Sequence, residues 1–252
     1  MSKAFYVTLP GRGLIHIEGE DRKAFLQGLV SNDMDRLAPG RILYACLLTP
    51  QGKFLHDFFI HEGDGFLLLD CEGGARAKDL HDRLNKYRLR SKVTLSVEEN
   101  VTVYAVFGSN EGLPDPRDVD LGRRSFEKPN LPEENFEAWD HARIAMGIPD
   151  GSRDMEVEKS TLLECNLDKF NAVDWNKGCY MGQELTARMH YRGLAKKHLY
   201  PVRITGDAPA PFSDISSIGN MRSSCGDIGL ALLKDDSIKE LDNGTYPIRL
   251  LG

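Results

Sequence analysis

The sequence predicts an α+β protein, in which antiparallel strands pack against separate helices. Two apolar runs, 42–49 and 54–61, are joined by Pro50-Gln51-Gly52-Lys53, where proline presets φ and glycine tolerates a positive φ. These runs are expected to form a hairpin. A later stretch, 75–88, carries its large apolar residues at helical spacing and predicts an amphipathic helix. Antiparallel strand pairs packed against separate amphipathic helices are typical of the α+β class.

The other elements of the first half follow in order. Residues 14–18 read as a short strand, and Gly19-Glu20-Asp21 then offers an acidic N-cap to a helix that closes at Asn32-Asp33. A turn at residues 62–65 leads into the next apolar run. The further strands expected in this half are 66–69, 93–97 and 101–107.

The second half begins with a change of composition. Residues 109–135 are rich in proline, glycine and acidic residues, which predicts a loop or the edge of a domain. A helix is expected over 133–144. Short strands at 198–204, 228–233 and 246–251 predict a small C-terminal β-barrel or sandwich. We therefore divide the chain into residues 1–195, with an internal boundary near 95–145, and residues 196–252.

Composition limits the class of protein. The chain has 252 residues, of which 41% are hydrophobic and 28% charged, as expected for a globular protein with one large or two modest cores. Its net charge of -6 argues against a surface built to coat nucleic acid. No apolar run approaches the roughly 18 residues that span a bilayer, and the first residues lack the apolar stretch of a signal peptide. We expect a cytoplasmic protein with no membrane contact.

The five cysteines are scattered and odd in number, and no two of them form a Cys-x-x-Cys pair. This argues against a disulfide framework and against a closed metal site. Cys179 stands out among them because Gly178 and Gly182 frame it and a run of good helix formers follows. A thiol at a helix entrance, near Lys177 and Arg188, would favour the thiolate that attacks electrophiles and binds soft metals. The alternative is a small buried hydrophobe in a glycine-rich turn.

The run Lys177-Gly178-Cys179-Tyr180-Met181-Gly182-Gln183-Glu184 matches the signature of the YgfZ family of GcvT-like, folate-binding proteins. The stretches 25–33, 48–57 and 163–168 also resemble that family, and 163–202 is most similar to the branch that includes mitochondrial iron-sulfur assembly factors. The resemblance covers nearly the whole chain. It implies a fold like the aminomethyltransferase of the glycine cleavage system, with three subdomains in a cloverleaf around a central hole that receives tetrahydrofolate.

The resemblance also implies a function. Family members support the maturation or repair of iron-sulfur enzymes in a folate-linked way, with indirect effects on tRNA modification. The implied partners are iron-sulfur assembly or client proteins and folate, and Cys179 would contact an iron-sulfur cluster in passing. The residues implied in folate binding are Trp139, Lys177, Tyr180, Gln183, Glu184 and Arg188.

Two of the implied folate-site positions have structural alternatives. Trp139 resembles a family tryptophan that would stack on a pterin ring, but it would equally suit the core side of an amphipathic helix. A second family tryptophan falls near Arg12 in this chain. Asp57 lies where the aminomethyltransferase has its catalytic aspartate, and it could protonate a folate nitrogen or serve as a strand-edge acceptor.

Three functions remain open at this point. The favoured one is an iron-sulfur maturation factor in which Cys179 contacts a cluster or a partner. Such a factor is not expected to be a conventional enzyme, and it is expected to be monomeric. The second is a folate-dependent aminomethyltransferase, for which 252 residues is short. The third is a tRNA-binding protein that uses the basic residues between 185 and 206, although those residues could also bind the folate tail or an acidic partner, or form a solvated face. Direct RNA binding is not expected, because no RNA-binding motif is present.

Overall fold

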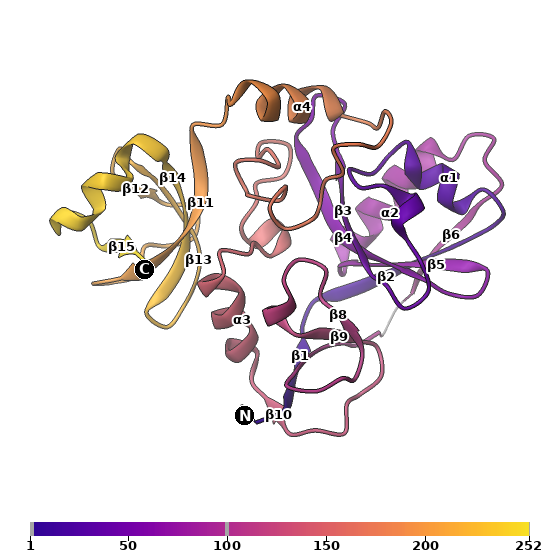
Figure 1. The fold of residues 1–252 in the computed structure, drawn as a ribbon, viewed down its shortest axis with the longest axis horizontal. Coiled ribbons are helices and arrows are strands. Elements are labelled where there is room, and N and C mark those ends of the chain that lie inside the picture. Colours follow the sequence, from indigo (N-terminus) through magenta and orange to yellow (C-terminus); the bar gives the residue numbers. More distant parts are fainter. Residues whose placement is uncertain (1–2, 99–100, 252) are drawn as a thin grey trace.

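Three five-stranded sheets organise the part of the chain that the computed structural model describes, residues 3–98 and 101–251. They form three lobes: the first lobe at the upper right of Figure 1, the second at the bottom and the C-terminal lobe at the left. Strands and helices segregate within each lobe, which confirms the predicted α+β class. None of the described helices combines the length and the apolar character needed to cross a membrane.

The first lobe is an antiparallel sheet in the order β3-β4-β5-β2-β6, with both of its helices on one face. Its elements are β2 (Arg12–Glu18), α1 (Arg22–Gln27), β3 (Leu43–Leu48), β4 (Phe54–Glu62), β5 (Phe66–Glu72), α2 (Ala75–Tyr87) and β6 (Thr94–Glu98). The hairpin predicted from 42–61 is thus confirmed as β3 and β4. Side chains alternate along β4, so that Phe58 and Ile60 meet the helices while Asp57 and Phe59 point to the middle of the molecule.

The first helix differs from the prediction at both ends. It stops at Gln27, well before Asn32-Asp33, and a 3-10 helix η1 (Met34–Arg36) follows. The Asp21 side chain makes no capping bond. Its carboxylate instead accepts the backbone N–H of Lys92, 2.7 Å away, because the loop before β6 passes beside it. A partner distant in sequence has displaced the local cap.

The second lobe has the strand order β10-β1-β7-β9-β8, with β1 and β10 parallel and the other pairs antiparallel. Its elements are β1 (Phe5–Leu9), β7 (Val103–Phe107), β8 (Leu113–Pro114), the 3-10 helix η2 (Val119–Leu121), β9 (Arg123–Ser125), β10 (Glu133–Glu134) and α3 (Phe136–Ala145). The expected loop 109–135 therefore holds three short strands. They are two or three residues long, too short to show an alternating pattern.

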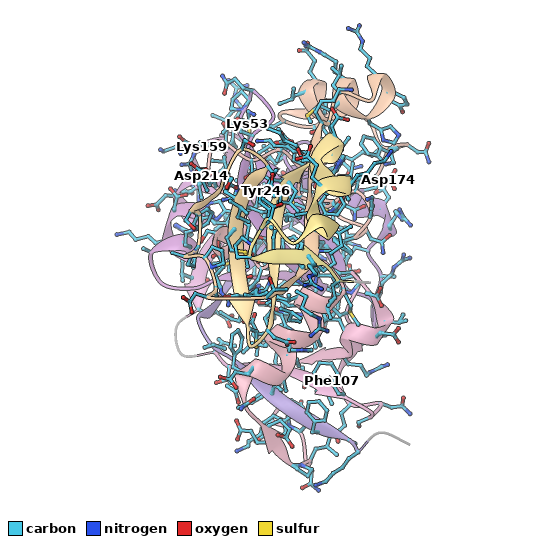
Figure 2. The ribbon with its side chains drawn as sticks, turned by 90° about the vertical axis from the view of Figure 1, so that its left-hand side faces the viewer. Lys53, Phe107, Lys159, Asp174, Asp214 and Tyr246 are labelled. Carbon is cyan, nitrogen blue, oxygen red and sulfur yellow. The ribbon has the colours of Figure 1, made fainter. Side chains whose placement is uncertain are left out.

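The C-terminal lobe is an antiparallel sheet in the order β12-β13-β14-β11-β15. Its elements are β11 (Lys197–Ile204), β12 (Asp214–Ile215), β13 (Gly219–Cys225), β14 (Ile228–Lys234), the 3-10 helix η4 (Asp235–Asn243) and β15 (Ile248–Leu250). Three of these strands were predicted, and β13 was missed because its sequence is mostly polar. In Figure 2 this lobe faces the reader, and Phe107 marks the second lobe below it. The division at residue 195 stays a prediction.

The connection between the second and C-terminal lobes joins all three. It contains the 3-10 helix η3 (Gly151–Arg153), a long irregular stretch and α4 (Gln183–Arg192), which lies along the top of the molecule in Figure 1. One apolar cluster combines Tyr44 and Phe59 of the first lobe, Met155 and Leu167 of the connection, and Leu230 of the C-terminal sheet. The first and C-terminal lobes therefore share a core with the connection, whereas Trp139 packs in the separate core of the second lobe.

Candidate functional site

The motif 177–184 forms a loop that is fastened to the first lobe by Lys177. Its Nζ donates hydrogen bonds to the backbone oxygens of Gln27 at 2.9 Å, Val30 at 2.7 Å and Asn32 at 2.7 Å. Burial lowers the pKa of Lys177 to about 8. The three carbonyls follow the end of α1, where a cation is favoured by the helix dipole. Lys177 is thus an anchor of the loop, and its ammonium group is already engaged.

The other motif residues also hold the backbone in place. The N–H of Met181 donates to the oxygen of Gly28 at 3.0 Å, and the N–H of Tyr180 donates to Oε1 of Gln183 at 3.1 Å. Gly182 has φ +80°, and a Cβ there would lie 2.4 Å from the oxygen of Thr49 in the β3–β4 turn. Only glycine satisfies both conditions. Of the side chains expected to contact folate, those of Lys177 and Gln183 therefore support the loop itself.

Cys179 projects from this fastened loop into solvent. Its side chain is exposed, whereas Cys46, Cys71 and Cys165 are buried and Cys225 is half-buried. The alternative that Cys179 is a buried hydrophobe is therefore wrong. Gly178 beside it has no atom within 4 Å of the place a Cβ would take, so the thiol stands on an open surface. No cluster of three metal-binding side chains occurs within residues 3–98 and 101–251.

The face of α4 next to this loop is aromatic and basic. The ring of Trp175 stacks on His190, with centroids 3.8 Å apart and an interplanar angle of 17°. Tyr191 packs edge-on against both rings and is 72% exposed. Arg188 does not approach the thiol as a free cation, because it pairs with Glu184 at 2.5 Å, one helical turn away. We call Trp175, His190, Tyr191 and the exposed Arg192 the α4 face.

Asp57 lies outside the motif loop, beside a cavity between the first and second lobes. It is 4% exposed, and its Oδ2 accepts the hydroxyl of Tyr44 at 2.8 Å. Its Oδ1 has no hydrogen-bond partner among the described residues. Burial, and secondarily the charge of Glu72, raises the pKa of Asp57 to about 6. The group is therefore a carboxyl that titrates within the range of a general acid or base.

Three buried arginines crowd the same cavity. Arg12 and Arg124 both bind Asp70, through Nε at 2.7 Å and 3.0 Å respectively. Arg117 donates two hydrogen bonds to Asp115, from Nε to Oδ1 at 3.0 Å and from Nη2 to Oδ2 at 2.8 Å. These arginines and aspartates, which we call the arginine cluster, join the first lobe to the second. The flanking charges hold the pKa of both aspartates below its usual range despite burial.

Trp139 lines the same cavity as Asp57 and the three arginines. It is 3% exposed and packs in the core of the second lobe, and its Nε1 has no partner among the described residues. The cavity that Trp139 shares with Asp57, Phe59 and the arginines has a volume of only about 20 Å³. Ligand sites for molecules of the size of folate occupy roughly 300 Å³ or more. The residues at the implied folate position therefore do not fit a pterin.

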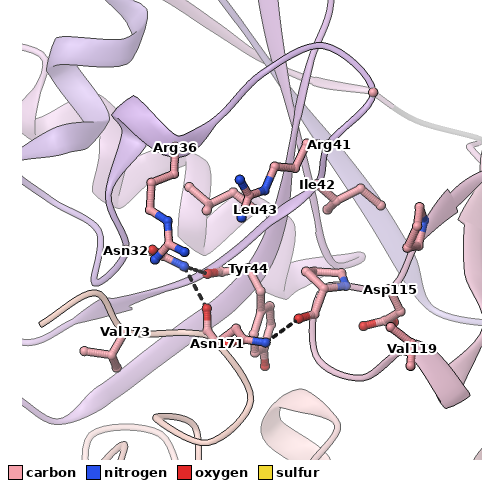
Figure 3. A pocket seen from close by; sticks show the side chains of 13 residues that line it. Asn32, Arg36, Arg41, Ile42, Leu43, Tyr44, Asp115, Val119, Asn171 and Val173 are labelled. Atoms are coloured by element: carbon pink, nitrogen blue, oxygen red, sulfur yellow. Dashed lines mark hydrogen bonds between the residues drawn. The ribbon is translucent and has the colours of Figure 1, made fainter.

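A larger outer pocket opens on the other side of Tyr44. Its volume is about 340 Å³, and Figure 3 shows Arg36 and Arg41 on one side of it and Asp115 and Val119 on the other. Arg36 is paired with Asp174 at 2.8 Å. Sequence reasoning missed this pocket, and it missed Arg117 and Arg124 as well, because their neighbours come from segments far apart in the chain. A buried arginine carries no local signal in the sequence.

The fold and the exposed motif loop together define a GcvT-like protein. Residues 196–250 match the family described as the CAF17 C-terminal beta-barrel domain. The chain aligns over 92% of its length with aminomethyltransferase T of the Bartonella henselae glycine cleavage system, covering 78% of that structure at a TM-score of 0.71 and 15% identity. This likeness confirms the predicted three-lobed fold.

The particular family follows from two relatives. The chain is 31% identical to the iron-sulfur cluster assembly factor IBA57 of Mus musculus and 32% identical to that of Homo sapiens, each over 92% of this chain and 78% of the relative. It belongs to the IBA57 family. Both relatives are named as mitochondrial, which contradicts the cytoplasmic location expected from the sequence.

Proposed function

We propose that this protein supports the maturation of iron-sulfur proteins, and that Cys179 is the group that meets the cluster. The observation that carries the proposal is an exposed thiol on a loop that hydrogen bonds of Lys177 and Gln183 hold in place. Relatives at 31% and 32% identity are named iron-sulfur cluster assembly factors. A soft thiolate is the usual protein ligand of such clusters.

One thiol cannot hold a cluster, because iron-sulfur clusters take several protein ligands. The described residues offer no group of three donors near Cys179 or elsewhere. The remaining ligands would therefore come from a second protein, and the cluster would be shared for as long as the two are in contact. Cys179 would lose its proton to solvent as Sγ binds iron.

The α4 face is the natural place for that second protein. It lies on the helix that follows the motif loop, and it exposes Tyr191 and Arg192 beside the stacked pair of Trp175 and His190. Aromatic side chains and arginine are enriched in protein interfaces. A cluster and its thiolates carry negative charge, so basic residues at the rim would speed their approach.

The test compares two cysteine variants. Cys179→Ser and Cys225→Ser each remove one thiol, but Cys225 is half-buried on β13 in the C-terminal lobe. We expect Cys179→Ser to abolish the recovery of cluster-dependent enzymes in cells that lack the native copy, and Cys225→Ser to leave it intact. Visible spectra after anaerobic incubation with iron, sulfide and a cluster carrier should show the same difference. Equal recovery in both variants would remove Cys179 from the mechanism.

The finer assignment to the YgfZ type, with an indirect effect on tRNA modification, is part of this proposal. It rests on the intact motif 177–184. A folate-dependent aminomethyltransferase remains the alternative, supported by the carboxyl of Asp57 but not by the cavity of about 20 Å³ around it. Failure to form methylenetetrahydrofolate from an aminomethyl-lipoyl carrier and tetrahydrofolate would exclude that activity. Salt-dependent tRNA binding would be the evidence for an RNA-binding function.

A further inference from the structure

The centre of the molecule is filled by side chains that reach it from three separate segments. Arg12 comes from β2, Arg117 from the stretch after β8 and Arg124 from β9. Their guanidinium carbons lie 5.7, 4.7 and 3.8 Å from the ring centroid of Phe59. Phe59 and Asp57 project from the same face of β4, so the arginines occupy the space over both.

These arginines are not mobile surface groups that a ligand could push aside. Arg117 and Arg124 are 4% and 3% exposed, and their partners Asp70 and Asp115 are equally buried. Asp70 is shared by Arg12 and Arg124, and Asp115 by Arg117 and Arg124, the latter pair at 3.6 Å. Displacing one guanidinium would break a buried ion pair and leave a buried carboxylate with a single partner, which is unfavourable. The cluster is therefore held from both lobes.

We infer that in this chain the arginine cluster occupies the central hole in place of a ligand. The cluster joins the first and second lobes there and leaves no room for a pterin. The remaining space of about 20 Å³ suits about one water molecule. The second family tryptophan would fall near Arg12, and in this chain Arg12 binds Asp70. The chain thus keeps the carboxyl of Asp57 without room for a substrate beside it.

The two tryptophans of the chain make this inference testable by fluorescence. Trp139 lines the central cavity, and Trp175 lies on the α4 face. The Trp175→Phe variant leaves Trp139 as the only reporter. Titration with 5-formyltetrahydrofolate to ~1 mM, a concentration at which even a weak site fills, should produce no saturable quenching beyond that of free N-acetyltryptophanamide. Saturable quenching at micromolar ligand that disappears in Asp57→Asn would overturn the inference.

Equilibrium dialysis of the wild-type chain with the same folate gives an independent reading. It does not depend on the folding of any variant. Absence of binding supports a closed centre, and so does binding that survives Asp57→Asn but is lost in Arg41→Ala, since Arg41 lines only the outer pocket. Binding that is lost in Asp57→Asn and kept in Arg41→Ala contradicts it. None of these outcomes bears on Cys179, whose role is tested by cluster transfer.

Discussion

The motif loop and the arginine cluster use their polar side chains in opposite ways. In the loop, Lys177 and Gln183 bind backbone groups and leave the Cys179 side chain free at the surface. In the cluster, Arg117 and Arg124 bind the buried carboxylates Asp115 and Asp70, and nothing but a cavity of about 20 Å³ remains. The interactions of the motif loop present the Cys179 thiol at the surface, whereas those of the arginine cluster fill the space between two lobes.

The difference corresponds to two possible uses of a GcvT-like fold. A transferase needs a central site that admits both folate and a second substrate. A factor that meets a cluster held by another protein needs an accessible ligand on a fixed support. The structure has the second arrangement at the surface and has lost room for the first at the centre.

The largest effect is expected from Arg124→Met. The variant removes the guanidinium that is shared by Asp70 and Asp115 and leaves both carboxylates with one partner each. Breaking a buried ion pair in this way costs about 3–5 kcal/mol. Urea denaturation followed by circular dichroism measures the loss. Arg188→Met is the matched control, because its partner Glu184 is 84% exposed and such surface pairs contribute roughly 0.5 kcal/mol. Similar losses in both would mean that the cluster does not join the lobes.

Asp57→Asn should instead stabilise the protein at neutral pH. The folded-state pKa of Asp57 is raised from 3.8 to about 6, so the native state binds the proton more tightly than the unfolded chain does. Between pH 4 and 6 the wild type therefore loses stability from this group as pH rises, and above pH 6 the loss is about 3 kcal/mol. Asparagine is neutral throughout and avoids it.

The measurement is the difference in unfolding free energy between Asp57→Asn and the wild type at several pH values. It should be near zero at pH 4 and grow to its full value by pH 7. Taking the difference is essential, because burial also lowers the pKa of His56 and His61 to about 4, and both oppose the trend of Asp57 in the wild type. A difference that does not depend on pH would show that Asp57 is ionised normally.

The contrast between the two regions also explains what could be predicted from sequence. The β3–β4 hairpin was predictable because its apolar runs and its Pro-Gly turn are local signals. Cys179 could be singled out as a candidate because the motif around it is contiguous. The anchoring by Lys177 could not be predicted, since its acceptors Gln27, Val30 and Asn32 precede it by about 150 residues. Such contacts follow from the tertiary fold.

The arginine cluster was hidden for a related reason. Arg124 stands in the stretch 109–135, whose composition predicts a loop or the edge of a domain. It belongs to β9, which forms because β7 and β8 pair with it. Charged residues are almost never fully buried unless paired. The pairing with Asp70 on β5 becomes visible only when two lobes are assembled. The resemblance to the GcvT-like family predicted the three lobes, but it did not predict what fills the space between them.

Lys177→Met tests the support of the thiol. The substitution keeps an unbranched side chain of similar length but removes three hydrogen bonds from a charged donor, and we expect a loss of about 2 kcal/mol. The loop should loosen, so that cluster transfer falls although Cys179 still reacts with Ellman's reagent. Lys169→Met, at an exposed lysine, is the control. Normal transfer by Lys177→Met would mean that the thiol does not need a fixed position.

The smallest effect on stability is expected from Tyr191→Ser on the α4 face. Tyr191 is 72% exposed, so its replacement should change the free energy of unfolding by roughly 0.5 kcal/mol or less. If this face receives the cluster carrier, the same variant should slow cluster transfer by about tenfold, as expected when an aromatic contact of an interface is removed. Leu89→Ser removes an even more exposed apolar side chain, 87% exposed and far from α4 in sequence, and should leave transfer unchanged. Equal rates in the two variants would place the partner elsewhere, whereas a defect in Tyr191→Ser alone would make the surface around Cys179 the working site of a fold whose centre is closed.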